Sequence, residues 1–176
     1  MVAAAREGAH ALLVAPTGGG KTLAGFLPSL VELAQAAGPD GYLENGESGR
    51  GGLHTLYVSP LKALTADIRR NLARPVAELG LAIRVEDRTG DTGQTQRRRQ
   101  RVDPPHVLLT TPESLALMLS YPEAPAIFGG LRRVVLDELH ALAESKRGDQ
   151  LMLGLARLRS LAPGLIATGQ IGRASC

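Results

Sequence analysis

The 176-residue sequence contains little cysteine, few lysines and no long apolar segment. Cys176 is the only cysteine, so the chain cannot form an internal disulfide, which favours a reducing compartment. The apolar run at residues 2–5 is too short for a signal peptide, and no segment approaches the length of a membrane span. We therefore expect a cytoplasmic protein with no membrane partner.

The composition is that of a globular protein, with 44% hydrophobic and 21% charged residues. A chain of this length supports one domain with a sizeable core, and disorder throughout is excluded. Three of the 20 basic residues are lysines, and the arginines cluster at Arg97, Arg98, Arg99 and Arg101. Such a cluster is typical of a solvated helix face, and it would also suit a nucleic-acid surface.

A glycine-rich segment lies between the apolar run at residues 11–14 and an amphipathic stretch that begins at Leu23. Consecutive glycines let backbone N–H groups converge on phosphate oxygens, and the positive end of the following helix adds to this cup. Lys21 would reach the outer phosphates, and the Thr22 hydroxyl would ligate Mg²⁺. The alternative is a turn that precedes Lys-Thr by chance. The predicted phosphate-binding residues are Ala15, Pro16, Thr17, Gly18, Gly19, Gly20, Lys21 and Thr22.

The second motif is acidic and follows the β-branched, apolar run at residues 131–136. Asp137 and Glu138 would stand at the carboxyl end of a buried strand, beside the phosphate loop of a parallel sheet. There Asp137 would hold Mg²⁺ directly or through water, and Glu138 would orient the attacking water. The alternative for this pair is a helix N-cap with an acid in the first turn.

Strand and helix patterns alternate along the chain, which predicts an α/β fold with a mostly parallel sheet and helices on both faces. The polar, glycine-rich segment at residues 38–52 has no period and is predicted to be a mobile surface loop. The predicted strands are residues 11–15, 53–58, 82–85, 107–110 and 131–136, and the predicted helices are residues 22–37, 61–72 and 150–161.

Two further strands end in a hydroxyl residue followed by proline, a signal for the first turn of a helix. In a parallel sheet these helix starts open on one edge, where they can hold a row of nucleic-acid phosphates; plain capping is the alternative. A lysine and a polar turn add to this edge. The predicted nucleic-acid contacts are Ser59, Pro60, Lys62, Thr89, Gly90, Asp91, Thr111 and Pro112.

The order of these segments resembles superfamily 2 helicases. Residues 15–22, 59–64, 89–92, 110–115 and 137–140 are similar to motifs I, Ia, the intervening glycine motif, Ib and II of that family. The resemblance is to the large helicase-related (Lhr-type) group, and within it to the ligase-associated DEXH-box helicases of DNA repair. It extends over residues 8–169 and includes residues 141–149 and 157–164.

The resemblance implies a RecA-like P-loop NTPase domain, the first of two in an ATP-dependent DNA helicase or translocase. It implies ATP and Mg²⁺ as cofactors, and Lys21, Asp137, Glu138 and His140 as catalytic residues, with His140 coupling hydrolysis to nucleic-acid contact. Its implied partners are single-stranded or partly duplex DNA, with RNA possible, a second RecA-like domain in the same chain, and DNA ligase or nuclease partners.

The sequence departs from the family pattern at both ends. Met1 stands too close to the phosphate loop to leave room for the adenine-reading glutamine motif, so ATP is preferred over GTP by analogy. We interpret residues 1–169 as the ATP-binding domain, and residues 170–176 as an aberrant tail in place of motif III, from a frameshift or an artificial end. Without a second domain and its arginine finger, the chain alone should hydrolyse little ATP. The alternatives are a non-catalytic P-loop module, or an RNA remodeller.

Overall fold

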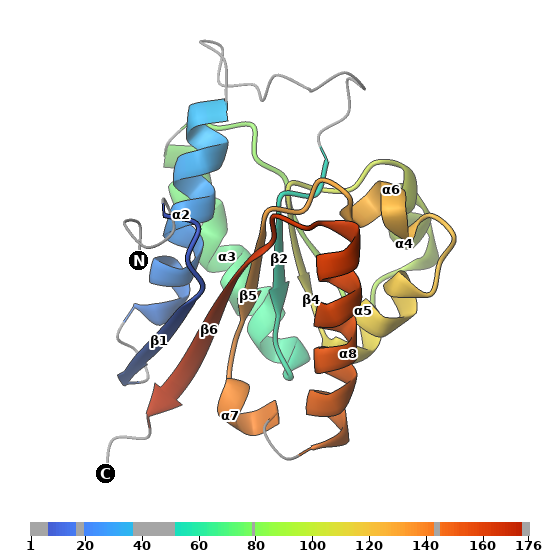
Figure 1. Ribbon diagram of the computed structural model, residues 1–176. Helices are drawn as coiled ribbons and strands as arrows, with labels where there is room; N and C mark the ends of the chain where they lie inside the picture. The colour runs from blue at the N-terminus through green and yellow to red at the C-terminus, as the bar shows by residue number, and fades with distance from the viewer. Residues whose placement is uncertain (1–6, 17–19, 37–51, 79, 143–144, 174–176) are drawn as a thin grey trace.

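The computed structural model describes residues 7–16, 20–36, 52–78, 80–142 and 145–173. These residues form one six-stranded sheet in the order β1-β6-β5-β2-β4-β3, and every neighbouring pair is parallel. The strands are β1 (Ala11–Pro16), β2 (Thr55–Val58), β3 (Val85–Arg88), β4 (Val107–Thr110), β5 (Arg133–Leu136) and β6 (Ile166–Arg173) (Figure 1). The predicted α/β class and parallel sheet are confirmed.

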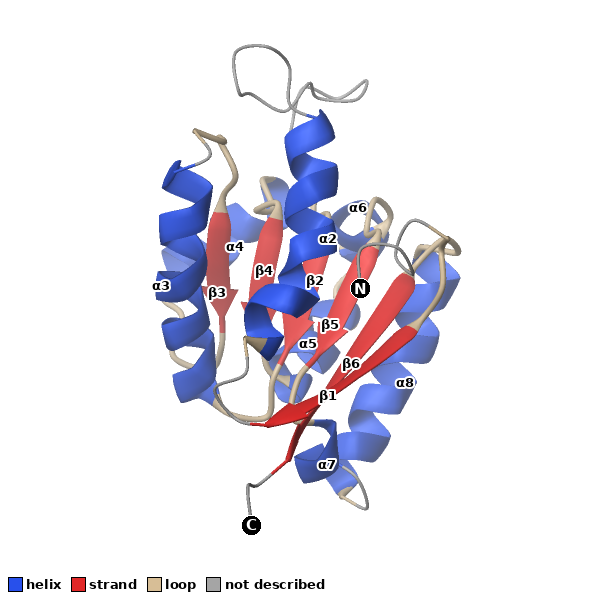
Figure 2. Ribbon diagram, turned by 90° about the vertical axis from the view of Figure 1, so that its left-hand side faces the viewer, coloured by secondary structure: helices blue, strands red, loops and turns tan. Residues whose placement is uncertain are grey.

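Helices cover both faces of this sheet, as predicted (Figure 2). One face carries α2 (Lys21–Ala36) and α3 (Lys62–Glu78). The other face carries α4 (Gln94–Val102), α5 (Pro112–Leu119), α6 (Ala124–Phe128) and α8 (Lys146–Leu161), while the short α7 (Leu139–Leu142) follows β5. No helix of the described ranges is long and apolar enough to cross a lipid bilayer.

Alternation along the central strands produces two apolar cores, one on each face. In β5, Val134 and Leu136 pack on the face of α5 and α8, whereas Val135 packs on the face of α2 and α3. Strands β2 and β4 alternate in the same way, since successive side chains of a strand point to opposite faces. Central strands buried on both faces therefore read as continuous apolar runs.

Four of the five predicted strands coincide with β1, β2, β4 and β5, whereas the fifth is displaced from β3 and the interior strand β6 was not predicted. The predicted strand at residues 82–85 lies three residues too early, because β3 is Val-Glu-Asp-Arg and only Arg88 among its residues is buried. Ile83 lies just before β3 and packs into the core, so its apolar side chain indicated a core position and not a strand position. The predicted loop at 38–52 lies outside the described residues except for Gly52.

One of the two predicted hydroxyl-proline helix starts is confirmed. Thr111 is the N-cap of α5, its side chain accepting a hydrogen bond from the Ser114 N–H, with Pro112 in the first turn. The other predicted helix is present as α3, but it begins at Lys62, so Ser59 is not its N-cap and Pro60 is not its first residue. Ser59 Oγ instead accepts from the Leu61 N–H at 3.4 Å, which forms a short turn ahead of the helix.

Strand β6 continues past the boundary predicted at residue 169. It pairs with β1 through Arg173 and with β5 through Gly169. Gln170 is fully buried, and its Nε2 donates to the Lys21 backbone carbonyl at 3.1 Å. An alanine methyl at Gly25 would lie 1.8 Å from that nitrogen, so Gly25 makes room for Gln170. The interpretation of residues 170–176 as a replacement for motif III stays a prediction.

Candidate nucleotide site and nucleic-acid edge

Lys21 opens helix α2 directly after the phosphate-loop region, and its side chain is only 8% exposed. Gly20 precedes it with a φ of +72°, a conformation that a residue with a Cβ adopts only with strain. The Lys21 ammonium is buried and has no hydrogen-bond partner among the described residues. Thr22 is half-buried beside it. Of the predicted phosphate-binding residues, Thr17, Gly18 and Gly19 lie outside the described residues.

A cavity of about 480 Å³ joins this helix start to the end of β5. It brings Gly20, Lys21 and Thr22 together with Asp137 and Glu138, which are more than 110 positions away in the sequence. Helix α3 forms its remaining wall, which the sequence patterns did not predict. The lining residues from α3 are Leu64, Asp67, Ile68, Asn71, Leu72 and Pro75.

The Asp137 carboxylate is buried and held by two donors. The Tyr57 hydroxyl donates to Oδ2, and the Glu138 backbone N–H donates to Oδ1 at 2.9 Å. Burial, and then the neighbouring Asp137 charge, raise the pKa of Tyr57 far above its ordinary value, so the hydroxyl remains a donor. Sequence reasoning missed Tyr57, although a tyrosine within an otherwise apolar strand signals that its hydroxyl needs a partner.

Glu138 is the non-glycine residue with a positive φ, +50°, among the residues described. This left-handed conformation costs about 1–3 kcal/mol and is concentrated at functional sites. Glu138 Oε2 lies 3.2 Å from His140 Nε2, so the two candidate catalytic side chains touch. His140 is exposed and does not line the cavity, unlike Lys21, Asp137 and Glu138.

Most side chains predicted to contact nucleic acid are buried. Ser59, Pro60, Thr111 and Pro112 point into the protein, whereas Lys62 and Asp91 are exposed. Lys62 Nζ lies 3.0 Å from Asp91 Oδ1 and packs over Gly90, where an added Cβ would be 3.2 Å from the ammonium. The exposed charge of the predicted edge is thus already paired within the edge.

The turn at residues 89–92 is closed by its own side chains. The Thr89 N–H donates to Thr92 Oγ1 at 2.9 Å, and the Asp91 N–H lies 3.3 Å from Thr89 Oγ1. Thr89 is buried. The structure therefore places all eight predicted nucleic-acid residues at the carboxyl edge of the sheet, with Lys62, Gly90 and Asp91 at its surface.

Arg147, in the first turn of α8, connects two segments of this edge. Its Nη2 donates to the Pro60 carbonyl at 2.8 Å, and its Nε donates to Glu113 Oε1 at 2.5 Å. Burial alone would raise the pKa of Glu113, but the hydrogen bond from Arg147, with smaller contributions from neighbouring donors, lowers it below its ordinary value. Sequence reasoning assigned Arg147 no role, although it lies in a segment that carried the family resemblance.

The chain matches known proteins over nearly its whole length. The model of the DEAD/DEAH box helicase family matches residues 1–171. The chain belongs to this family. It is 42% identical over 173 residues to the ATP-dependent helicase Lhr-Core protein 2 of Thermococcus barophilus, a match that covers 93% of this chain and 19% of that protein. It is 44% identical over 162 residues to the Lhr helicase/uracil glycosylase of Escherichia coli, covering 86% of this chain and 10% of that protein.

Solved structures agree with this assignment. The structure of the Mycobacterium smegmatis helicase Lhr bound to single-stranded DNA and AMP-PNP superposes with a TM-score of 0.81 and 41% identity, over 96% of this chain and 21% of that one. The predicted Lhr-type resemblance is confirmed, and the predicted ligase-associated subgroup stays a prediction. The chain spans about a fifth of the Thermococcus barophilus relative.

Proposed function

We propose that this domain binds ATP with Mg²⁺ in the cavity between α2, α3 and the end of β5, as the ATP-binding part of a DNA helicase or translocase. The observation that carries the proposal is the buried Lys21 ammonium, which has no partner in the part of the chain that the structure describes and lines a cavity together with Asp137 and Glu138. A buried cation without a partner is costly, and phosphate oxygens would offset that cost.

The donors around the cavity fit a magnesium-nucleotide complex. The described residues contain no group of three or more His, Cys, Asp or Glu side chains that could hold a metal ion. Mg²⁺ commonly keeps several waters and is bound through one or two protein ligands together with phosphates, and Thr22 and Asp137 would supply those ligands. When bound, Mg²⁺ would neutralise charge on the phosphates. Each oxygen of Asp137 already accepts one hydrogen bond and keeps a lone pair for a metal-bound water.

Glu138 is suited to orient and deprotonate the attacking water. Its backbone N–H donates to Asp137 Oδ1, and its carboxylate oxygen Oε2 lies 3.2 Å from His140 Nε2. His140 would couple hydrolysis at Glu138 to nucleic-acid contact, because it touches Glu138 and is exposed on α7. Lys21 would hold the outer phosphates in line with that water.

Titration of a fluorescent ATP analogue tests the nucleotide site. Lys21→Ala removes a charge-assisted contact, so affinity should fall at least about tenfold. Lys146→Ala is the matched control, because Lys146 is exposed on α8 and does not line the cavity. Equal dissociation constants for Lys21→Ala and the control would refute the proposed site.

Catalysis is tested separately from binding. Glu138→Gln should retain nucleotide affinity within about threefold while abolishing phosphate release, because it removes the base and keeps the shape. The comparison uses a form of the protein that contains the second RecA-like domain. Nucleotide binding with no phosphate release in either the parent or the variant would favour the non-catalytic module instead.

We also propose that the carboxyl edge of the sheet binds a nucleic-acid strand, with DNA repair as the setting and a DNA ligase or nuclease as partner. The co-crystallised single-stranded DNA of the Mycobacterium smegmatis relative supports this proposal. Lys62→Glu should weaken binding of single-stranded DNA at low salt, because phosphate contacts are electrostatic. An unchanged affinity and salt dependence would make Lys62 an ordinary surface residue.

A further inference from the structure

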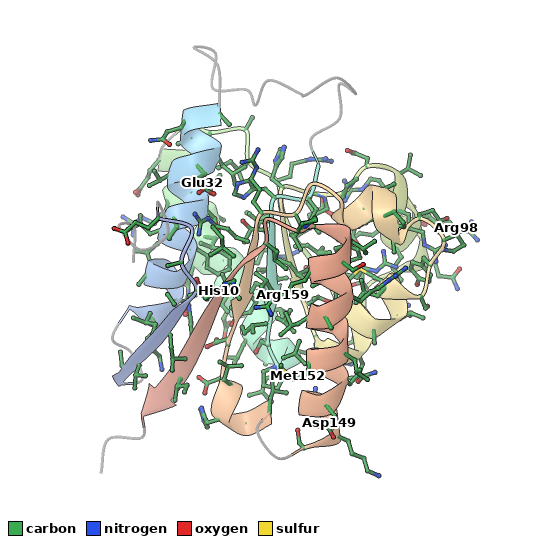
Figure 3. The ribbon with its side chains drawn as sticks, in the orientation of Figure 1. His10, Glu32, Arg98, Asp149, Met152 and Arg159 are labelled. Atoms are coloured by element: carbon green, nitrogen blue, oxygen red, sulfur yellow. The ribbon has the colours of Figure 1, made fainter. Side chains whose placement is uncertain are left out.

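A basic pocket lies beside the predicted nucleic-acid edge, on the side of α4. It has a volume of about 340 Å³ and is lined by Gln94, Arg97, Arg98, Arg101 and Tyr121. Figure 3 shows Arg98 at the outer rim of the molecule, on the opposite side from Glu32. We call these five residues the arginine pocket.

Within the described part of the chain, the arginines of this pocket have no carboxylate partner. Arg97, Arg98 and Arg101 form no ion pair, and the Nε atoms of Arg97 and Arg101 are buried without a hydrogen-bond acceptor. Arg99, on the same helix, differs because its Nη2 lies 2.5 Å from Glu86 Oε2. The protein thus neutralises one arginine of α4 and leaves the three that face the pocket uncompensated.

The nearby acidic side chains are already engaged. Glu86 also accepts from Gln100 at 2.9 Å, Glu113 pairs with Arg147, and Asp91 pairs with Lys62. Buried Arg88 lies beside the pocket, with its Nη2 3.2 Å from the Tyr121 hydroxyl. It adds a further positive charge, because it has no carboxylate partner in the described residues. The uncompensated positive charge of the pocket would therefore attract an anion from outside the chain.

The geometry favours a phosphate over a base. The guanidinium of Arg101 stacks on the Tyr121 ring, 3.9 Å from its centroid, and Arg88 approaches the same ring at 5.6 Å. This stacking occupies the aromatic surface on which a base would otherwise lie. The groups that remain open are guanidinium N–H donors, which match phosphate oxygens.

Arg97 connects the pocket to the nucleic-acid edge. Its Nη2 donates to the carbonyls of Thr89, at 3.0 Å, and Gly90, at 2.6 Å. The same arginine lines a second hollow with Thr89, Gly90 and Ser114. A strand that follows the turn at residues 89–91 would therefore place its next phosphates over α4.

We infer that the arginine pocket binds backbone phosphates of a nucleic-acid strand, extending the edge formed by Lys62 and the turn at residues 89–91. The inference rests on the proposed nucleic-acid binding at that edge. It adds Arg98 and Arg101 as phosphate contacts and Arg97 as the residue that positions the turn beside them.

Fluorescence anisotropy with a labelled single strand of about 20 nucleotides tests the inference, a length that exceeds the usual site size. Arg98→Gln should weaken binding about twofold to fivefold at low salt, because the contact is exposed. It should also lower the slope of log K against log salt concentration by about 0.7. Arg98→Gln/Arg101→Gln should weaken binding about tenfold and lower the slope by about 1.4.

Arg157→Gln is the matched control, since Arg157 is exposed on α8 and lies outside the pocket. Because Arg98 is exposed, its replacement should leave the fold intact even if Arg101→Gln does not. If Lys62→Gln weakens binding and Arg98→Gln behaves like Arg157→Gln, the arginine pocket is refuted and the edge stands. If the parent chain shows no salt-dependent binding, both the edge and the pocket are refuted.

Discussion

The Tyr57 hydroxyl donates a hydrogen bond to the Asp137 carboxylate, across the neighbouring strands β2 and β5. The Tyr57 ring also stacks on Phe26 of α2, with centroids 5.4 Å apart. One side chain therefore connects the helix that begins at Lys21 with the acidic motif at the end of β5. The relative position of the two halves of the candidate nucleotide site depends on this contact.

Replacing Tyr57 with phenylalanine should lower the free energy of unfolding by about 1.5 kcal/mol, the usual contribution of a hydrogen bond to a charged group. The ring and its stacking are retained. Urea unfolding of Tyr57→Phe, of Asp137→Ala and of the double variant measures the pair directly. If Tyr57→Phe costs as much in the Asp137→Ala background as in the parent, the bond contributes nothing.

The close contact between Gly25 and Gln170 predicts that the effect of Gly25→Ala on the free energy of unfolding changes sign when Gln170 is replaced. In the parent, Gly25→Ala drives a methyl group into the buried Gln170 amide and should destabilise by about 1–3 kcal/mol. In a Gln170→Ala background the obstacle is gone, and alanine in a helix should stabilise by up to about 1 kcal/mol relative to glycine. Urea unfolding of the parent, the two single variants and the double variant measures these effects. An equal effect of Gly25→Ala in both backgrounds would contradict the packing described.

Asp91→Asn should release Lys62 from its ion pair and strengthen binding of single-stranded DNA at low salt by about twofold to fivefold. The salt dependence should become steeper, because one more cation then contacts phosphate. Asp149→Asn on α8 is the control for the change in net charge. Anisotropy measurements in which both variants behave alike would assign the effect to overall charge.

The burial of His54 predicts that the free energy of unfolding decreases in mild acid. Burial, with help from Arg132 and Arg133, lowers the pKa of His54 to about 4, although Glu32 Oε2 lies 3.3 Å away and opposes the shift. Below its ordinary pKa of 6.5, the unfolded chain binds a proton that the folded chain does not. Stability should therefore fall as pH decreases from 6.5, by about 1.4 kcal/mol per pH unit, until the pH nears the folded pKa.

Urea unfolding at pH 7 and pH 5 measures this loss. His54→Gln should remove about 2 kcal/mol of the difference between the two pH values. His106, whose pKa is also lowered by burial, remains in both proteins and cancels in the comparison. An equal pH dependence in parent and variant would show that His54 is not the group responsible.

Local signals in the sequence were sufficient for the central strands β2, β4 and β5, for the phosphate-loop helix and for the Thr111 cap, but not for the interior strand β6. Each depends on residues that are neighbours along the chain: continuous apolar runs in β2, β4 and β5, which are buried on both faces, and a hydroxyl three residues before the N–H that it accepts from. The parallel sheet followed from the alternation of elements, and it placed all strand ends at one edge. The grouping of Lys21 with Asp137 and Glu138 was predictable for this reason.

Only the tertiary structure decided which distant side chains meet at that edge. The strand order puts β5 next to β2, so that Tyr57 meets Asp137, and puts β6 between β1 and β5, so that Gln170 reaches Lys21. The α3 wall of the cavity and the Arg147 bridge arise in the same way. Contacts of this kind depend on packing between elements far apart in sequence, and neither hydrophobic period nor motif spacing encodes that order.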